Sequence, residues 1–194
     1  SHFKVLQHGV VKGEVLWNMT GQHSVANALA TIAAAEHVGV SIATACEALS
    51  NFGGVKRRME LLGTVRGIEV YDDFAHHPTA IDTTLEGARK RLGERKLWAI
   101  IEPRSNTMRM GSHKDGLAHS ARLADEVIWY QPEGLDWDLQ PVIDAAPNKA
   151  KVARTLDDII QTVVAEAGEG DAVVIMSNGG FGGLHQKLMT VLQA

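Results

Sequence analysis

The sequence has little cysteine, no long hydrophobic run and no large excess of one charge. Its one cysteine, Cys46, cannot form a disulfide within the chain, so a disulfide framework is excluded and a reducing compartment is permitted. Apolar runs such as 172–176 are far shorter than the ~18 residues of a membrane-spanning helix. The first residues, Ser1 to Val5, lack the apolar core of a signal peptide. We therefore expect neither a membrane span nor a secretion signal.

The charge balance excludes a strongly basic surface of the kind that binds nucleic acid. Lys and Arg number 19 and Asp and Glu number 23, which gives a net charge of −4. Of the 194 residues, 45% are hydrophobic and 22% are charged, as in ordinary globular proteins and unlike disordered ones. This length allows one or two domains.

The first 52 residues read as short strands followed by two helices. Apolar residues separated by glycine predict strands joined by tight turns. The alanine-rich stretch 24–38 predicts a helix that is apolar nearly all round and therefore buried, with Ser24 as a candidate N-cap. A second helix is expected from the cap Ser41 to about Asn51. These elements cannot bury a core alone and the chain begins without methionine, so we expect the end of a larger domain.

From residue 53 onward, strand-like and helix-like segments alternate regularly. The expected strands lie near 68–71, 97–101, 127–130, 151–153 and 172–176, and the expected helices near 79–92, 114–124, 156–167 and 184–192. This order predicts an α/β fold with a mostly parallel sheet covered by helices on both faces. Residues 131–148 show the least regular pattern.

Three polar loops follow three of the expected strands: 72–78, 102–107 and 177–183. Ligands of open parallel sheets bind beyond the carboxyl ends of the strands. We therefore expect these loops to meet at one edge of the sheet and to form the functional site.

The first loop carries two carboxylates and two imidazoles between Asp72 and His77. Pro78 suits the first position of the following helix, which makes His77 its N-cap. Histidine caps less well than Ser, Thr, Asp or Asn, so its side chain is expected to serve another purpose. The loop is a solvated acidic turn, a metal site, or a site for a ligand's hydroxyl or charged groups.

The other two loops each have two interpretations. The glycines of 177–183 either let backbone amides approach an anion or only serve a tight crossover. They do not match G-x-G-x-x-G, which disfavours a dinucleotide-dependent oxidoreductase. Arg104, with Arg109 nearby, either holds a carboxylate or phosphate or is simply solvated.

Two segments outside these loops also carry candidate binding residues. The cluster 53–58 is either a solvated basic linker or a phosphate or ribose contact at a hinge. His23 and Asn27 lie four positions apart and so share one helix face. A buried asparagine needs partners for its amide, which an adenine edge or an internal hydrogen bond would supply.

Taken together, the motifs resemble those of the Mur ligases of bacterial peptidoglycan synthesis. The resemblance rests on G-x-H-x-x-x-N-A at 21–28, FGGVKRRME at 52–60 and YDDFAHHPTAI at 71–81. EPRSNTM at 102–108 and MSNGGFGG at 176–183 resemble one branch in particular. That branch joins the recycled tripeptide L-alanyl-γ-D-glutamyl-meso-diaminopimelate to UDP-N-acetylmuramate.

The resemblance implies that residues 1–52 are the end of a central ATPase domain and residues 53–194 a Rossmann-like C-terminal domain. The phosphate loop and the UDP-sugar domain of the family are not in this chain. The chain alone is therefore expected to be inactive and to work with those domains in the bacterial cytoplasm. No nucleic-acid or membrane partner is expected.

The resemblance also implies roles for individual residues. His23 and Asn27 match positions that meet adenine, and Arg58 and Asp73 match positions that reach the ribose and help to lock domain closure. Ser24 stands where the family usually has asparagine. His76 is the implied catalytic residue, by orienting the acceptor amine or by assisting its deprotonation. The implied tripeptide contacts are Phe74, His76, His77, Arg104, Ser105, Asn106, Thr107, Arg109, Ser177 and Asn178.

The implied reaction uses ATP to activate the muramate carboxylate as an acyl phosphate, which the tripeptide amine attacks. Mg²⁺ would bridge the phosphates through ligands mostly outside this chain, and no metal ligand is predicted here. Two alternatives remain open: the related ligase that adds L-alanine to UDP-N-acetylmuramate, and a nucleotide-binding module without catalytic activity.

Overall fold

The computed structural model describes residues 1–103, 114–131, 133–135 and 137–194, and it divides the chain into two compact units. The first unit is Ser1–Lys56 and the second is Arg57–Ala194, whereas the sequence placed a boundary between residues 52 and 53. Each unit has its own hydrophobic core. In the described part of the chain, no helix combines the length and apolarity needed to cross a membrane.

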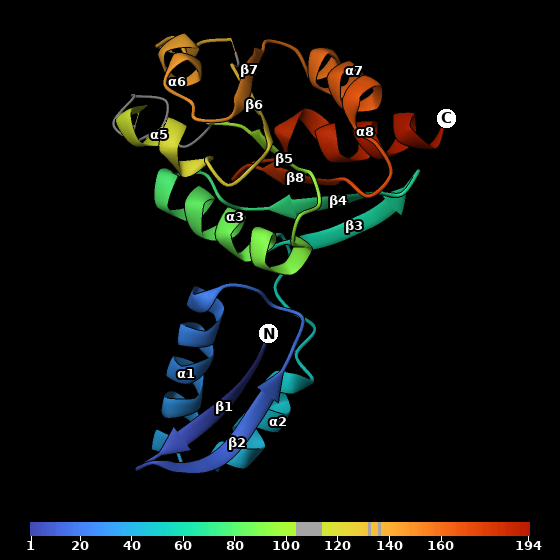
Figure 1. Ribbon diagram of the computed structural model, residues 1–194. Coiled ribbons are helices and arrows are strands. Elements are labelled where there is room, and N and C mark those ends of the chain that lie inside the picture. Colours follow the sequence, from blue (N-terminus) through green and yellow to red (C-terminus); the bar gives the residue numbers. More distant parts are fainter. Residues whose placement is uncertain (104–113, 132, 136) are drawn as a thin grey trace. The chain divides into compact units, whose positions relative to one another are not determined.

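The first unit is a β-hairpin packed against two helices (Figure 1). Strands β1 (His2–Gln7) and β2 (Val10–Leu16) pair in antiparallel fashion, and helices α1 (Gln22–His37) and α2 (Ile42–Ser50) follow. Ser41 caps α2 as predicted, because its Oγ accepts a hydrogen bond from the Thr44 amide at 3.1 Å. The core residues of this unit are Val5, Val15, Trp17, Ala28, Ile32, Ala45 and Cys46.

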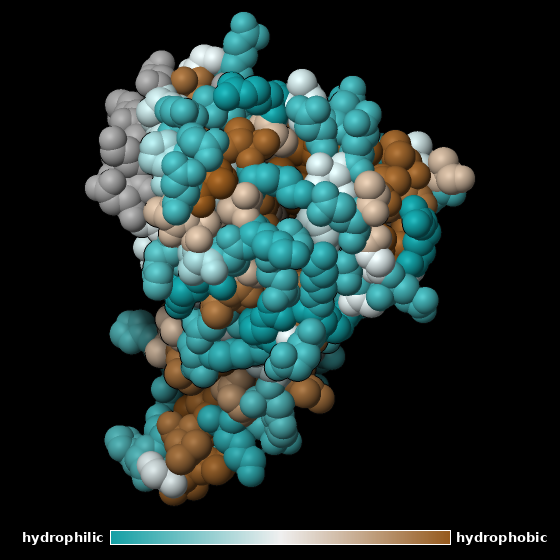
Figure 2. Space-filling model, turned by 45° about the horizontal axis from the view of Figure 1, so that its top comes forward, coloured by the Kyte–Doolittle hydropathy of each residue, from teal (hydrophilic) through white to brown (hydrophobic). Residues whose placement is uncertain are grey.

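Two predictions about α1 were wrong. The helix buries only Ser24, Ala28 and Ile32 rather than all its faces, because the unit offers it only a hairpin and one short helix to pack against. Ser24 is not its N-cap: Gly21 is, and no side chain caps this end. Apolar surface is visible on this unit in the lower part of Figure 2. The exposed large hydrophobic residues of the unit include Leu6, Val10, Val11, Leu16, Leu29 and Val38.

The second unit is built on a six-stranded sheet. Its strands, in spatial order, are β3 (Glu60–Val65), β4 (Ile68–Asp73), β8 (Ala172–Met176), β5 (Leu97–Ile101), β6 (Glu126–Tyr130) and β7 (Lys149–Ala153). All neighbours pair in parallel except β3, which is antiparallel to β4. The five parallel strands were predicted. The antiparallel β3 was missed, because an edge strand that leaves Leu61 and Leu62 exposed has no clear apolar alternation.

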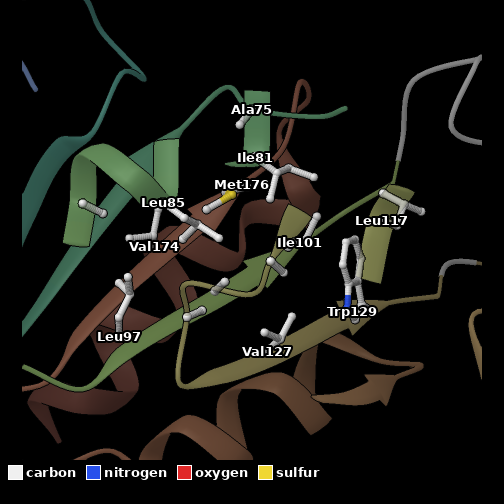
Figure 3. Packing of buried hydrophobic residues seen from close by; sticks show 14 of the residues in the cluster. Ala75, Ile81, Leu85, Leu97, Ile101, Leu117, Val127, Trp129, Val174 and Met176 are labelled. Atoms are coloured by element: carbon white, nitrogen blue, oxygen red, sulfur yellow. The ribbon is translucent and has the colours of Figure 1, made fainter. Parts of the chain in front are cut away.

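Helices cover both faces of this sheet (Figure 1). Helices α3 (Pro78–Leu92), α5 (Lys114–Ser120) and α6 (Gln140–Asp144) belong to one face, and α7 (Leu156–Glu166) and α8 (Leu184–Gln193) to the other. The alternation along β8 shows the two faces: Val174 and Met176 pack beneath α3 (Figure 3), while Val173 and Ile175 face α7 and α8. The predicted α/β class is confirmed. Helix α5 ends earlier than predicted, and α6 was missed.

Strand β8 returns between β4 and β5, and this insertion creates the functional edge. In the register of the two parallel pairs, Met176 lies opposite both Asp73 and Ile101. The loops that follow β4, β8 and β5 therefore leave the same edge side by side, as the sequence predicted. Of the loop after β5, Glu102 and Pro103 belong to the described residues.

Candidate functional site

Asp72, near the carboxyl end of β4, forms ion pairs on both of its oxygens. Nε of Arg57 lies 3.1 Å from Oδ2, and Nε2 of His185 lies 3.1 Å from Oδ1, though without the alignment of a directional hydrogen bond. Burial would raise the pKa of Asp72. The contacts with His185 and Arg57 outweigh burial and hold this pKa below its usual value. Asp72 is therefore an anion that lies between the side chains of Arg57 and His185.

Asp73, the next residue, points into the interior and is only 2% exposed. Its carboxylate accepts hydrogen bonds from the amides of Met59 and Ala75, each at 2.8 Å, and from Oγ1 of Thr84 at 3.1 Å. Burial raises the pKa of Asp73 in spite of these bonds. The carboxylate thus holds the loop after β4 in place, and its contact with a ribose stays a prediction.

The orientation of His76 is fixed by the loop itself. Its Nδ1 lies 2.9 Å from the carbonyl oxygen of Phe74. A carbonyl oxygen can only accept, so Nδ1 carries the proton and donates it. In the neutral ring, Nε2 therefore keeps its lone pair. The rings of Phe74 and His76 meet edge to face, with their centroids 5.4 Å apart. This geometry suits His76 to accept a proton or a hydrogen bond from a ligand amine.

His77 is the N-cap of α3, as predicted, and its side chain takes part in the cap. Its Nδ1 accepts a hydrogen bond from the Ala80 amide at 3.4 Å, so the ring does cap the helix. This bond is long for its type. Capping accounts for the position of His77, and its contact with the tripeptide stays a prediction.

The loop after β8 is tied to the loop after β5 by a buried pair. Oγ of Ser177 donates to Oε2 of Glu102 at 2.5 Å and accepts from the Gly179 amide at 2.9 Å. Ser177 and Glu102 are both buried, whereas Asn178 is half-buried. Ser177 thus shapes the loop from within. Its contact with the tripeptide, and that of Asn178, stay predictions.

The glycines of this loop have a conformational role. Phe181, Gly182 and Gly183 all have positive φ in the turn that leads into α8, with values of 43°, 56° and 75°. Glycine adopts this region without the strain that a Cβ atom causes. The tight-crossover interpretation is thus supported. The ring of Phe181 packs against Tyr130, with centroids 5.3 Å apart. Burial raises the pKa of Tyr130, and so does the nearby charge of Glu102.

Of the predicted nucleotide residues, His23, Asn27 and Arg58 are exposed, whereas Asp73 is buried. His23 and Asn27 lie on α1, and Asn27 is exposed, which corrects the expectation of a buried amide. A Cβ atom at Gly21, where φ is 84°, would lie 2.6 Å from the His23 ring, so only glycine leaves room for that ring. Ser24 is buried and its Oγ donates to the Thr20 carbonyl at 2.6 Å. In the second unit, the exposed Arg58 places its guanidinium 5.6 Å from the centre of the Phe74 ring.

Several residues that build this edge were not selected from the sequence: Arg57, Glu102, Tyr130 and His185. Arg57 and Glu102 lie in the segments 53–58 and 102–107, from which Arg58 and Arg104 were selected instead. His185 stands in the first turn of α8, directly after the glycine-rich loop, and that position is the one signal that could have found it. Their partners are distant in the sequence, so composition and spacing do not reveal them.

Part of the predicted peptide site lies in a segment that the structure does not describe. Arg104, Ser105, Asn106, Thr107 and Arg109 lie outside the described residues. Among residues that are described, no three His, Cys, Asp or Glu side chains gather as a metal site requires.

The family follows from comparison with known proteins. Residues 57–179 match the family model described as "Mur ligase, glutamate ligase domain". The chain belongs to the Mur ligase family. The match begins at Arg57, which is also the first residue of the second unit. Of the quoted motifs, 71–81 and 176–183 lie in this unit, at the sheet edge described above.

Similar proteins within the Mur ligase family are named as peptide ligases. A Haemophilus influenzae protein named UDP-N-acetylmuramate–L-alanyl-γ-D-glutamyl-meso-2,6-diaminoheptandioate ligase is 47% identical over 100% of this chain and 43% of its own length. A crystallised murein peptide ligase from Psychrobacter arcticus is 56% identical, with a TM-score of 0.76 over 100% of this chain and 42% of its own. The chain therefore spans less than half the length of these relatives.

A third similar protein is a solved domain from Haemophilus ducreyi, described as part of a ligase for the same muramate and peptide substrates. It is 40% identical, with a TM-score of 0.59, and covers 69% of this chain and 98% of its own length. A domain of this family thus exists as a separately solved structure.

Proposed function

We propose that this chain is the C-terminal portion of a murein peptide ligase, which joins L-alanyl-γ-D-glutamyl-meso-diaminopimelate to UDP-N-acetylmuramate at the expense of ATP. The observation that carries the proposal is identity of 47% and 56% along the whole chain with two proteins named as such ligases. The first unit would be the end of the central ATPase domain, and the second would be the C-terminal domain.

The proposed reaction has two steps. The muramate carboxylate attacks the γ-phosphorus of ATP and releases ADP, which gives an acyl phosphate. The amine of the tripeptide then attacks the acyl carbon, phosphate leaves and the amine loses a proton. Such a reaction depends on positioning and on charge stabilisation. Mg²⁺ would neutralise phosphate charge when bound. No residue of this chain is proposed as its ligand.

In this proposal the carboxyl edge of the second unit receives the acceptor peptide. His76 orients the attacking amine and takes its proton on Nε2, because the Phe74 carbonyl holds Nδ1 in the protonated form. Phe74, His77, Ser177 and Asn178 lie in the two described loops beside it, and Arg104 and Arg109 would pair with peptide carboxylates. The edge also keeps water away from the acyl phosphate.

The nucleotide contacts are assigned residue by residue. His23 and Asn27 would meet the adenine, and Arg58 would reach the ribose. Asp73 is assigned to the ribose as well, and it also holds the loop after β4 through its hydrogen bonds. The relatives named above are bacterial. We place the reaction in the bacterial cytoplasm, as a recycling step of peptidoglycan synthesis, with the rest of the parent protein as the partner of this chain.

The test is an assay of ADP release by the full-length parent protein with ATP and UDP-N-acetylmuramate. We expect turnover with the tripeptide and little with L-alanine, and no turnover by the 194-residue chain alone. Turnover with L-alanine alone would identify the alanine-adding relative. No turnover with either acceptor would leave a nucleotide-binding module as the better account.

The same assay tests His76. His76→Ala should lower kcat by about 10²- to 10⁴-fold, the usual contribution of a positioned acid–base group. His37→Ala is the matched control, because His37 is an exposed histidine in the last turn of α1. An unchanged kcat in His76→Ala would remove this residue from the chemistry.

A further inference from the structure

Arg57 joins three segments of the carboxyl edge through one side chain. Its Nε donates to Oδ2 of Asp72 at 3.1 Å, and its Nη2 donates to the carbonyl oxygens of Ser177 at 2.5 Å and Gly179 at 2.8 Å. Its guanidinium carbon lies 5.1 Å from the centre of the Phe74 ring. The end of β4, the loop after β4 and the loop after β8 therefore share this one contact.

The backbone of Arg57 is held as firmly as its side chain. Its amide donates to Oε2 of Glu60 at 2.8 Å, and its carbonyl accepts from the Phe74 amide at 2.9 Å. Its φ of 58° is in the left-handed region, which is strained for a residue with a Cβ atom. Such a conformation persists only where the surrounding contacts over-determine it.

The contacts need the guanidinium in particular. A planar fork can donate to a carboxylate and two carbonyl oxygens at once, whereas the lysine ammonium is a point charge on a flexible stem. The neighbouring Arg58, by contrast, is exposed, and a ribose contact is assigned to it. The side chain of Arg57 is only 29% exposed, and its donors are directed at the protein.

We propose that Arg57 is a positioning residue for the acceptor peptide. It sets the placement of the loop 74–77 against the loop 177–179, which are the two described segments assigned to the tripeptide. It does so by holding Ser177 and Gly179 through their carbonyl oxygens and Phe74 through its amide and ring. This inference rests on the proposed function. It predicts that a change at Arg57 affects the acceptor and leaves UDP-N-acetylmuramate binding unaffected.

The experiment compares Arg57→Lys with Arg89→Lys in the full-length protein. Arg89 is a matched control because it too is a multiply bonded arginine, with a side chain 26% exposed and bonds to Asp125 and to the carbonyls of Leu123 and Gly93. Asp125 also accepts from the amide of Leu97, the first residue of β5. Arg89 therefore lies at the opposite edge of the sheet. Melting temperature and the KM of each substrate are measured for both variants.

We expect both variants to lose thermal stability to a similar degree. Only Arg57→Lys should lower kcat/KM for the tripeptide, by about 10- to 100-fold, because displacing a positioning group by about 1 Å has effects of this size. Its KM for UDP-N-acetylmuramate should remain that of the wild type. Equal losses of tripeptide kcat/KM in the two variants would show that Arg57 only stabilises the fold, and would overturn the inference.

A second variant covers the case in which Arg57→Lys does not fold. Asp72→Asn leaves Arg57 in place and removes the charge that orients its Nε, so it should produce a smaller change selective for the tripeptide. Unchanged tripeptide kinetics in Asp72→Asn would then contradict the inference. If the wild-type protein shows no tripeptide-dependent turnover at all, the proposed function fails, and that result is distinct from either outcome at Arg57.

Discussion

At the scale of single residues, Asp72 and Asp73 show how one strand gives adjacent carboxylates opposite properties. Side chains alternate along β4, so Asp72 faces His185 on α8, while Asp73 faces Thr84 on α3. The pKa of Asp72 is lowered and that of Asp73 is raised. The sequence marks both residues as chemically interesting. It cannot show that Asp72 is the paired one, because His185 lies in the last helix, far from Asp72 in the sequence.

The lowered pKa of Asp72 predicts a pH-dependent contribution to stability. A carboxyl whose pKa is lower in the folded state stabilises the protein above its unfolded-state pKa of about 3.9, and this contribution is lost as the pH falls through the folded-state value. Asp72→Asn should therefore lower the free energy of unfolding at pH 7 by about 1–3 kcal/mol. The difference from the wild type should shrink toward zero in strong acid, which denaturant titrations across this pH range would measure.

Asp157→Asn is the matched control, since Asp157 is exposed in the first turn of α7. This variant should change the free energy of unfolding only slightly. If Asp72→Asn shows the same small difference from the wild type at every pH, the ion pairs of Asp72 contribute nothing to the fold.

At the scale of elements, prediction succeeded where an element is buried on both faces. Strands β5 and β8 are continuous apolar runs, and their bounds were predicted to the residue. The edge strand β3 and the short helix α6 were missed, because each places few residues in the core. For α1, the alanine-rich pattern indicated a helix but could not show how many of its faces find a partner.

The glycine-rich turn before α8 provides a test at this scale. Gly182→Ala should destabilise the protein by about 1–2 kcal/mol, the penalty for a side chain in the left-handed region. The φ of Gly182 is +56°, and a Cβ atom added there would also lie 2.7 Å from Cδ1 of Leu156. The free energy of unfolding of the 194-residue chain is the quantity to measure.

Gly180→Ala is the control within the same loop. Gly180 has a φ of −82° and open space around its Cβ position, so this change should be nearly neutral, within about 0.5 kcal/mol. Equal destabilisation by the two substitutions would contradict the conformational role assigned to Gly182.

At the scale of the whole molecule, topology explains which part of the site could be predicted. Alternating strands and helices require the loops after parallel strands to lie at one edge, so the meeting of the loops after β4 and β8 followed from the sequence. The Arg57 network did not follow, because the contact of Arg57 with Ser177 spans 120 residues. No local pattern specifies a hydrogen bond to a carbonyl oxygen at that distance.

The resemblance to Mur ligases supplied residue roles that the fold alone does not supply. For His23, Asn27 and Arg58, it implies contacts with the nucleotide. For Asp73 and Ser177, the structure adds that they are buried and hydrogen-bonded within the chain. Positioning of the loops is therefore the role that the second unit contributes most directly.

The most direct test of this account is a crystal structure of the full-length protein with UDP-N-acetylmuramate, a non-hydrolysable ATP analogue and the tripeptide. The account predicts that the peptide lies along the loops after β4 and β8, with its amine nitrogen about 2.6–3.2 Å from Nε2 of His76. A peptide bound away from this edge, or an amine out of reach of His76, would contradict it.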